Sequence, residues 1–198
     1  MALLKDHNAY LGIPFTLTRR QTHLFQPLLQ KVNLKVDAWK KYLSKAGKLI
    51  MIKSILQAIP LHLMSCIKLP QGVCLNLEKA IRKFFWGVGG RRGCQRDKKI
   101  HWVGWDILCQ RKVEGGLGLR RIGLFNQSLL AKQGWNLFIN PNSLLARLYK
   151  ELYHPNSTFL EATVGRRSSP YWKGLLWGRI LLFKGMGWRI RSGEYPER

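Results

Sequence analysis

Lysine and arginine are the residues of this chain whose number and spacing best support a chemical role. The 198 residues include 34 Lys and Arg against 10 Asp and Glu, a formal net charge of +24. Such cations gain affinity for nucleic acids because they release condensed counterions from the phosphates. An anionic membrane surface is the second polyanion that fits this charge. The composition therefore predicts binding to a polyanion and leaves its class open.

The basic residues cluster at 31–53, at 82–83 and in the loop at 87–99. Seven lysines and a single acid, Asp37, occupy residues 31–53. Most of these lysines have no acidic residue four positions away that could neutralise them on a helix. A charge run can also be an ordinary solvated surface, which is the alternative interpretation. We expect a nucleic-acid-binding site made of Lys40, Lys41, Lys45, Lys48, Lys53, Arg82, Lys83, Arg91, Arg92, Lys98 and Lys99.

The acidic residues give no sign of a catalytic centre. Metal-dependent phosphoryl transfer needs clustered carboxylates to hold Mg²⁺, whereas the ten acids of this chain are scattered singly. No Gly-x-Ser-x-Gly frame supports a nucleophile either. We therefore expect no catalytic residue, no cofactor and no small-molecule substrate.

Cys94, His101 and Cys109 form the tightest cysteine and histidine grouping. Structural zinc sites usually take two ligands from one Cys-x2–4-Cys turn, and this grouping has neither such a turn nor a fourth ligand. We expect no metal site. Four cysteines without a paired motif are typical of reduced thiols inside a cell.

Apolar residues at helical spacing predict three helices in the first half of the chain. The first runs from about residue 27, with a stripe at Leu28, Val32, Val36, Trp39 and Leu43. Ser44 is expected to cap the second, because its hydroxyl can accept a bond from the first turn. The second should end before Pro60, and its expected apolar positions are Ala46, Ile50, Ile55 and Ile59. The third should bury Val73, Leu77, Ala80, Ile81, Phe84 and Phe85 and end at a glycine-rich stretch.

The second half gives weaker signals. After a basic, glycine-rich loop at 87–99, residues 100–105 and the turn at 115–118 suggest irregular, aromatic-anchored structure. A helix is expected at about 124–139, with core candidates Phe125, Leu129, Trp135 and Phe138. Ser143 should cap another helix through about residue 152. The remainder lacks a clear period. The predicted fold class is mainly α, a helical bundle followed by a helical connector with short irregular aromatic segments.

No apolar run approaches the 18 residues that a transmembrane helix needs. The N-terminal residues meet a charge too early for a secretory signal. We expect an intracellular protein, with nucleus and mitochondrion both left open.

A series of short motifs resembles one known family. Tyr-Leu-Gly-Ile-Pro at 10–14, Phe-Phe-Trp-Gly at 84–87 and Gly-Gly-Leu-Gly at 115–118 are examples. Further matching segments lie at 39–50, 57–60, 64–66, 68–70, 101–103, 105, 108–109, 125–126, 129–135 and 141–147. In this order they resemble plant LINE-type (non-LTR) retrotransposon reverse transcriptases, in the region C-terminal to the catalytic palm. The front part is also similar to uncharacterised plant mitochondrial open reading frames.

The resemblance implies a fragment of an RNA-directed DNA polymerase without its catalytic carboxylates, since the metal-binding box would lie before Tyr10. It divides the chain into a post-palm segment at 1–26, a thumb-like region at 27–86, the loop at 87–99, a connector-like region at 100–193 and a tail at 194–198. Lys40, Lys41, Lys45 and Lys48 fall in the thumb-like block, which in the family grips the primer–template backbone. We expect non-specific nucleic-acid binding. A relic without activity and a membrane-surface protein are the alternatives.

Overall fold

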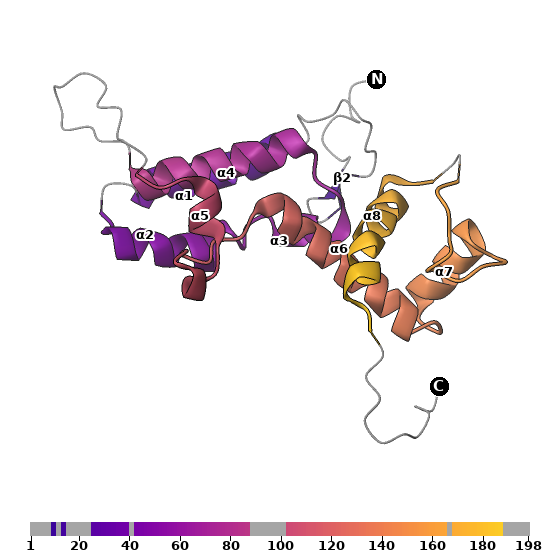
Figure 1. Cartoon of the computed structure of the whole chain (residues 1–198). Coiled ribbons are helices and arrows are strands. Elements are labelled where there is room, and N and C mark those ends of the chain that lie inside the picture. The colour runs from indigo at the N-terminus through magenta and orange to yellow at the C-terminus, as the bar shows by residue number, and fades with distance from the viewer. Residues whose placement is uncertain are drawn as a thin grey trace, which may run out of the picture. The chain divides into compact units, whose positions relative to one another are not determined.

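The computed structural model describes residues 9–10, 13–14, 25–39, 42–87, 102–165 and 168–187 (Figure 1). The chain forms two compact units, Met1–Asn126 and Gln127–Arg198, and each is described by itself. Its elements are mainly α-helices, as predicted. Several predicted site residues fall outside the described residues, namely Lys40, Lys41, Arg91, Arg92, Lys98 and Lys99, and so do Cys94 and His101 of the rejected metal grouping. The predicted division at 87–99 stays a prediction.

The described part of the first unit is built mainly from short and medium helices. Strands β1 (Ala9–Tyr10) and β2 (Ile13–Pro14) pair antiparallel. The helices are α1 (Gln26–Trp39), α2 (Lys45–Met51), the π-helical η2 (Ile52–Leu56), α3 (Leu61–Cys66), α4 (Gln71–Trp86), α5 (Trp105–Cys109) and the 3₁₀ turn η3 (Lys112–Glu114). Helix α6 (Ile122–Ile139) begins in this unit and continues into the second.

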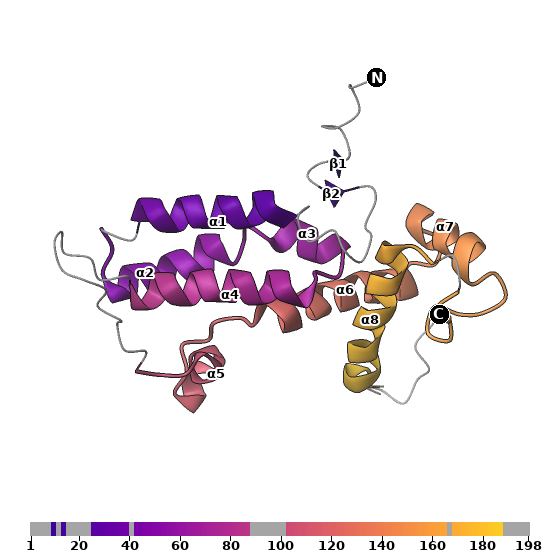
Figure 2. The same ribbon diagram turned by 90° about the horizontal axis from the view of Figure 1, so that it is seen from above.

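The core of the first unit lies between α1, α2 and α4, which run side by side in Figure 2. Helix α1 buries Leu28, Val32 and Val36 of the predicted stripe, whereas Trp39 is half-buried and Leu43 lies beyond the end of the helix. Helix α4 buries the predicted apolar face except Ala80, which is half-buried, and it also buries Cys74. Each fully buried side chain of this size stabilises the fold by roughly 1.5–3 kcal/mol. Two predicted helix ends are also confirmed. Ser44 Oγ caps the start of α2 by accepting from Gly47 N at 3.2 Å, and Gly87 ends α4 with a φ of 79°.

The second predicted helix differs from expectation in its buried face. Ala46 and Ile50 are exposed, so this part of the prediction was wrong, while Lys48, Ile52 and Leu56 are buried. The buried residues recur every four positions, and the helix changes from α to π geometry at Ile52. A π turn adds a residue to the turn and so rotates the side chains that follow it, and Leu56 rather than the predicted Ile55 is fully buried. Residues 61–66 form a further helix, α3, between the second and third predicted helices.

Asn126 ties three segments of the first unit together. Its side chain is fully buried, with 0% exposed. The Oδ1 atom accepts from Leu69 N at 2.9 Å, and Nδ2 donates to the carbonyls of Met64 at 2.6 Å and Ile67 at 2.8 Å. The amide thereby satisfies the end of α3 and the connection into α4 from a position on α6.

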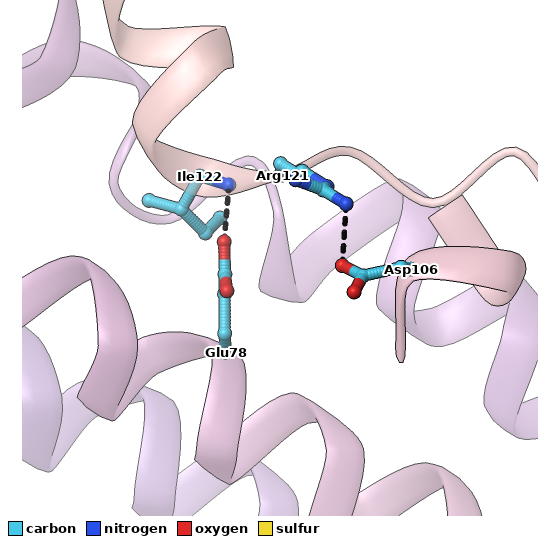
Figure 3. Close-up of polar contacts among 4 residues, drawn as sticks. All are labelled: Glu78, Asp106, Arg121 and Ile122. Atoms are coloured by element: carbon cyan, nitrogen blue, oxygen red, sulfur yellow. Dashed lines mark hydrogen bonds and ion pairs between the residues drawn. The ribbon is translucent and has the colours of Figure 1, made fainter. Parts of the chain in front are cut away.

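The start of α6 is anchored by a carboxylate from α4 (Figure 3). Glu78 Oε1 accepts from Ile122 N at 2.8 Å. A negative charge at a helix N-terminus is favourable because it interacts with the unpaired N–H groups and the helix dipole. Close by, Arg121 forms an ion pair with Asp106, both of them exposed. These contacts hold α4, α5 and the beginning of α6 in one unit.

The second unit packs the rest of α6 with α7 (Leu144–Tyr153) and α8 (Pro170–Gly185). Ser143 caps α7 as predicted, accepting from Ala146 N at 3.3 Å. Trp172 lies at the centre with 0% exposed. The rings around it belong to Tyr149, Tyr153, His154 and Phe159.

The sequence does not predict α8 and misplaces the core face of α6. Trp135 and Phe138 are 39% and 42% exposed, so their assignment to the core was wrong, and Phe125 and Leu129 are half-buried. The buried positions of α6 are instead Ile122, Asn126, Leu130, Ala131, Gly134 and Leu137. Apolar residues surround α6 and α8, so neither helix has the single stripe that periodicity detects.

Helices α6 and α8 approach each other closely at Gly178. A Cβ atom placed there would lie 2.6 Å from Ala131 N and 2.6 Å from Leu130 C, both backbone atoms that cannot move aside easily. Glycine is therefore required by the packing at this position. Gly185, on the same helix, has nothing within 4 Å of its corresponding position.

We predict that Asn126→Leu lowers the free energy of unfolding by at least about 2 kcal/mol, because three buried backbone groups are left without a partner. Urea unfolding followed by circular dichroism measures this difference. The control is Asn76→Leu, an exposed asparagine on α4, which should change stability by no more than about 0.5 kcal/mol. Equal effects of the two variants would show that Asn126 does not hold the segments together.

We also predict that Gly178→Ala destabilises the second unit by about 1–3 kcal/mol through overpacking. Gly185→Ala should leave stability unchanged or raise it slightly, because alanine favours helix over glycine. Thermal unfolding of both variants beside the parent chain provides the comparison. An unperturbed Gly178→Ala protein would contradict the close approach of α6 and α8.

Candidate nucleic-acid interface

Lys45 lies at the first turn of α2, against the C-terminal end of α4. Its Nζ donates to the carbonyls of Phe85 at 3.1 Å and Trp86 at 3.4 Å. It also lies 5.1 Å and 4.7 Å from the centroids of those two rings. A cation at this end satisfies unpaired carbonyls and interacts favourably with the helix dipole. Lys45 therefore has a structural role, although its side chain is exposed.

Lys48 is the most buried of the predicted binding residues that the structure describes, with 8% exposed. Its Nζ lies 5.6 Å from the centroid of the Phe84 ring. The aliphatic part of a lysine packs well against apolar neighbours, and here it extends the buried row formed with Ile52 and Leu56. Little of this side chain remains for contact with a phosphate.

Lys53, Arg82 and Lys83 have different surroundings. Lys53 is half-buried and Lys83 is exposed, and neither makes a hydrogen bond or ion pair within the described residues. The guanidinium of Arg82 lies 5.7 Å from the Trp105 ring centroid. Its Nε is buried and finds no hydrogen-bond acceptor in the part of the chain that the structure describes. Among these three, Lys83 is thus the residue most available to a ligand.

Three exposed lysines outside the predicted set lie on α1 and α4. Lys79 lies one turn before Lys83 on α4, so the two share a face. Lys31 and Lys35 are exposed one turn apart on α1, and Lys35 Nζ lies 5.6 Å from the Trp39 ring centroid. Their positions off the apolar stripes are the signal that could have placed them in the site.

The nearby carboxylates are engaged elsewhere. Glu78 accepts from Ile122 N, and Asp106 pairs with Arg121. Glu114 Oε2 accepts from Arg111 N at 3.4 Å. These acids serve helix ends and turns, and Asp37, the acid of α1, has an interaction of its own. Together α1 and α4 carry five Lys and Arg residues against two acids, Asp37 and Glu78, so the electrostatic field around them is positive.

The thiols of Cys74 and Cys109 are held in their neutral form. Burial raises the pKa of Cys74 from its ordinary value of 9.0 to about 11, and the charge of Glu78 adds to the shift. The same two causes, in the same order, raise the pKa of Cys109 to about 11. A protonated thiol is a poor nucleophile and a poor metal ligand. In the described ranges no three His, Cys, Asp or Glu residues gather in a way that could hold a metal ion.

Membrane-spanning helices are not found in the described part of the chain. None of its helices is both long enough and apolar enough to cross a bilayer.

Comparison with known proteins identifies two plant relatives. The chain is 41% identical over 141 residues to "Uncharacterized mitochondrial protein AtMg00310" of Arabidopsis thaliana, covering 71% of this chain and 88% of that protein. It is 34% identical over 188 residues to "Putative ribonuclease H protein At1g65750" of the same organism, covering 92% of this chain but 29% of that protein. No protein-family model matches. The resemblance to uncharacterised plant mitochondrial reading frames is confirmed, and that to reverse transcriptases stays a prediction.

Proposed function

This chain belongs to the family of the uncharacterized mitochondrial protein AtMg00310 of Arabidopsis thaliana, and we propose that it binds the nucleic-acid backbone non-specifically through a basic helical surface. By origin it is a fragment of a plant mobile-element reverse transcriptase, and it has no catalytic activity of its own. The chain spans 29% of the length of its ribonuclease H-named relative.

The observation that carries this proposal is that four lysines of α1 and α4 are exposed, while these two helices contain only two acids, Asp37 and Glu78. Lys79 and Lys83 lie one turn apart on α4, and Lys31 and Lys35 do so on α1. Lys45 and Lys48 act first as part of the fold that presents this surface. The proposed site also includes residues outside the described ranges that continue the same sign of charge, namely Lys40, Lys41, Arg91, Arg92, Lys98 and Lys99.

The mechanism is electrostatic. Each lysine that contacts a phosphate releases condensed counterions, so binding is independent of sequence and weakens steeply as salt rises. Phosphate contacts position a protein on a duplex without reading its bases. The order of motifs along the chain supports a thumb-like ancestry for this surface, and the scattered carboxylates support the absence of polymerase chemistry.

We predict that the double charge reversal Lys79→Glu and Lys83→Glu weakens binding to an RNA–DNA hybrid by about tenfold or more at about 50 mM salt. The plot of log affinity against log salt concentration should become shallower by about two, because each of the two lysines no longer neutralises a phosphate. Fluorescence-anisotropy titration of a labelled hybrid, repeated up to about 200 mM salt, measures both quantities.

The matched control reverses two exposed lysines of the second unit, Lys132→Glu and Lys173→Glu. It changes the net charge by the same amount and should reduce affinity much less. Equal reductions from the two pairs would indicate that overall charge, rather than the α4 surface, determines binding. Tighter association with anionic vesicles than with the hybrid would overturn the proposal in favour of a membrane-surface protein, and no saturable binding would favour a relic without activity.

A further inference from the structure

The second unit contains a cavity of about 240 Å³ beside α7 and the connection that follows it. Its walls include Phe138, Tyr149, Lys150, His154, Ser157 and Phe159. Pockets for drug-sized ligands are roughly 300–1,000 Å³, so this one suits a smaller group. Four aromatic or imidazole rings in its lining favour a flat, aromatic occupant.

The core of the second unit fixes the aromatic walls. Trp172 is fully buried, and its ring centroid lies 5.5 Å from that of Tyr149, 5.4 Å from His154 and 5.9 Å from Phe159. The His154 ring is nearly parallel to Trp172, at 17°. These three walls are therefore positioned before any ligand arrives, which lowers the ordering cost of binding.

The polar groups of the lining can form hydrogen bonds with the edge of a flat heterocycle. The Ser157 carbonyl lies 3.0 Å from His154 Nδ1, and a carbonyl can only accept, so Nδ1 carries the proton. In the neutral ring Nε2 is then the atom with a free lone pair. Ser157 and Thr158 contribute hydroxyl-bearing side chains to the lining.

Helix α7 also carries two basic residues at or near this cavity. Lys150 lines the cavity, and Arg147 lies one turn earlier on the same helix and is exposed. The described part of the second unit contains six Lys and Arg residues and two acids, Glu151 and Glu161. Glu161 Oε2 accepts from Thr158 N at 3.4 Å. An anionic group attached to the flat occupant would thus be favoured.

We propose that this cavity takes one unstacked nucleobase of a single-stranded nucleic acid, while Lys150 and Arg147 contact the adjoining phosphates. The inference rests on the proposed function and deepens it, because the first unit would bind backbone and the second would bind a base. Base–aromatic stacking is tolerant of sequence because every base has a π face. The chain should consequently prefer single strands with bases to the bare backbone.

The test compares two labelled single strands of equal length and charge, one an oligoadenylate and the other an abasic phosphodiester chain. Anisotropy titration of the full chain should show about tenfold tighter binding to the oligoadenylate. Phe138→Ala should remove most of that difference and leave affinity for the abasic strand unchanged. Phe138 is 42% exposed, so its truncation leaves the core around Trp172 in place.

The control variant is Phe183→Ala, an aromatic residue of the same unit that is 55% exposed and lies outside this cavity. It should keep the full preference for the oligoadenylate. A second variant, Lys150→Ala, should weaken binding to both strands by a similar factor, since it removes a phosphate contact. Thermal unfolding of each variant establishes whether the second unit remains folded.

The outcomes separate this inference from the proposed function. Equal affinity of the parent chain for both strands would overturn the base site and leave backbone binding intact. A preference that survives Phe138→Ala, or that Phe183→Ala removes equally, would overturn the assignment to this cavity. Failure of both strands to bind would overturn the base site together with the proposed function.

Discussion

The buried amide of Asn126 is the interaction on which the arrangement of the first unit depends. One side chain on α6 bonds to Met64, Ile67 and Leu69, which end α3 and lead into α4. Buried backbone groups left without partners are costly, so these segments are correctly placed only when the amide is present. Helix α4 starts two residues after Leu69, and it carries Lys79 and Lys83, two of the four exposed lysines of the proposed interface. The position of the charged surface therefore follows from a neutral, fully buried group.

The fold uses some of its cations and leaves others for a ligand. Lys45 satisfies the carbonyl end of α4, and Lys48 extends the buried row of α2. In the second unit Arg179 donates to the carbonyls of Phe159 and Ala162, both at 2.7 Å, and burial lowers its pKa. Cations that satisfy carbonyls stabilise the protein itself, whereas the exposed lysines of α1 and α4 add mutual repulsion. A polyanion relieves that repulsion, which links the stability of this chain to its proposed ligand.

The spacing of apolar residues predicts those helices that are buried on one face and exposed to solvent on the other. Helices α1 and α4 each have one apolar stripe, and Ser44 and Ser143 are cap residues placed just before a helix, so local patterns suffice for them. Helix α8 and the core face of α6 escape prediction because their apolar residues surround the helix. The buried roles of Lys48 and Asn126 also escape, since their partners come from other helices and connections far away in the sequence. The charge run predicts that a basic surface exists, but packing decides which lysines remain exposed on it.

In our account, the chain folds stably despite its high net positive charge and uses that charge to bind a polyanion. Thermal unfolding of the full chain, followed by far-ultraviolet circular dichroism with and without a saturating RNA–DNA hybrid, tests both parts together. At about 50 mM salt we expect a cooperative transition whose midpoint the hybrid raises, because ligands that bind the folded state stabilise it. At about 200 mM salt that increase should largely disappear. A transition without cooperativity, or a midpoint that the hybrid leaves unchanged at both salt concentrations, would contradict the account.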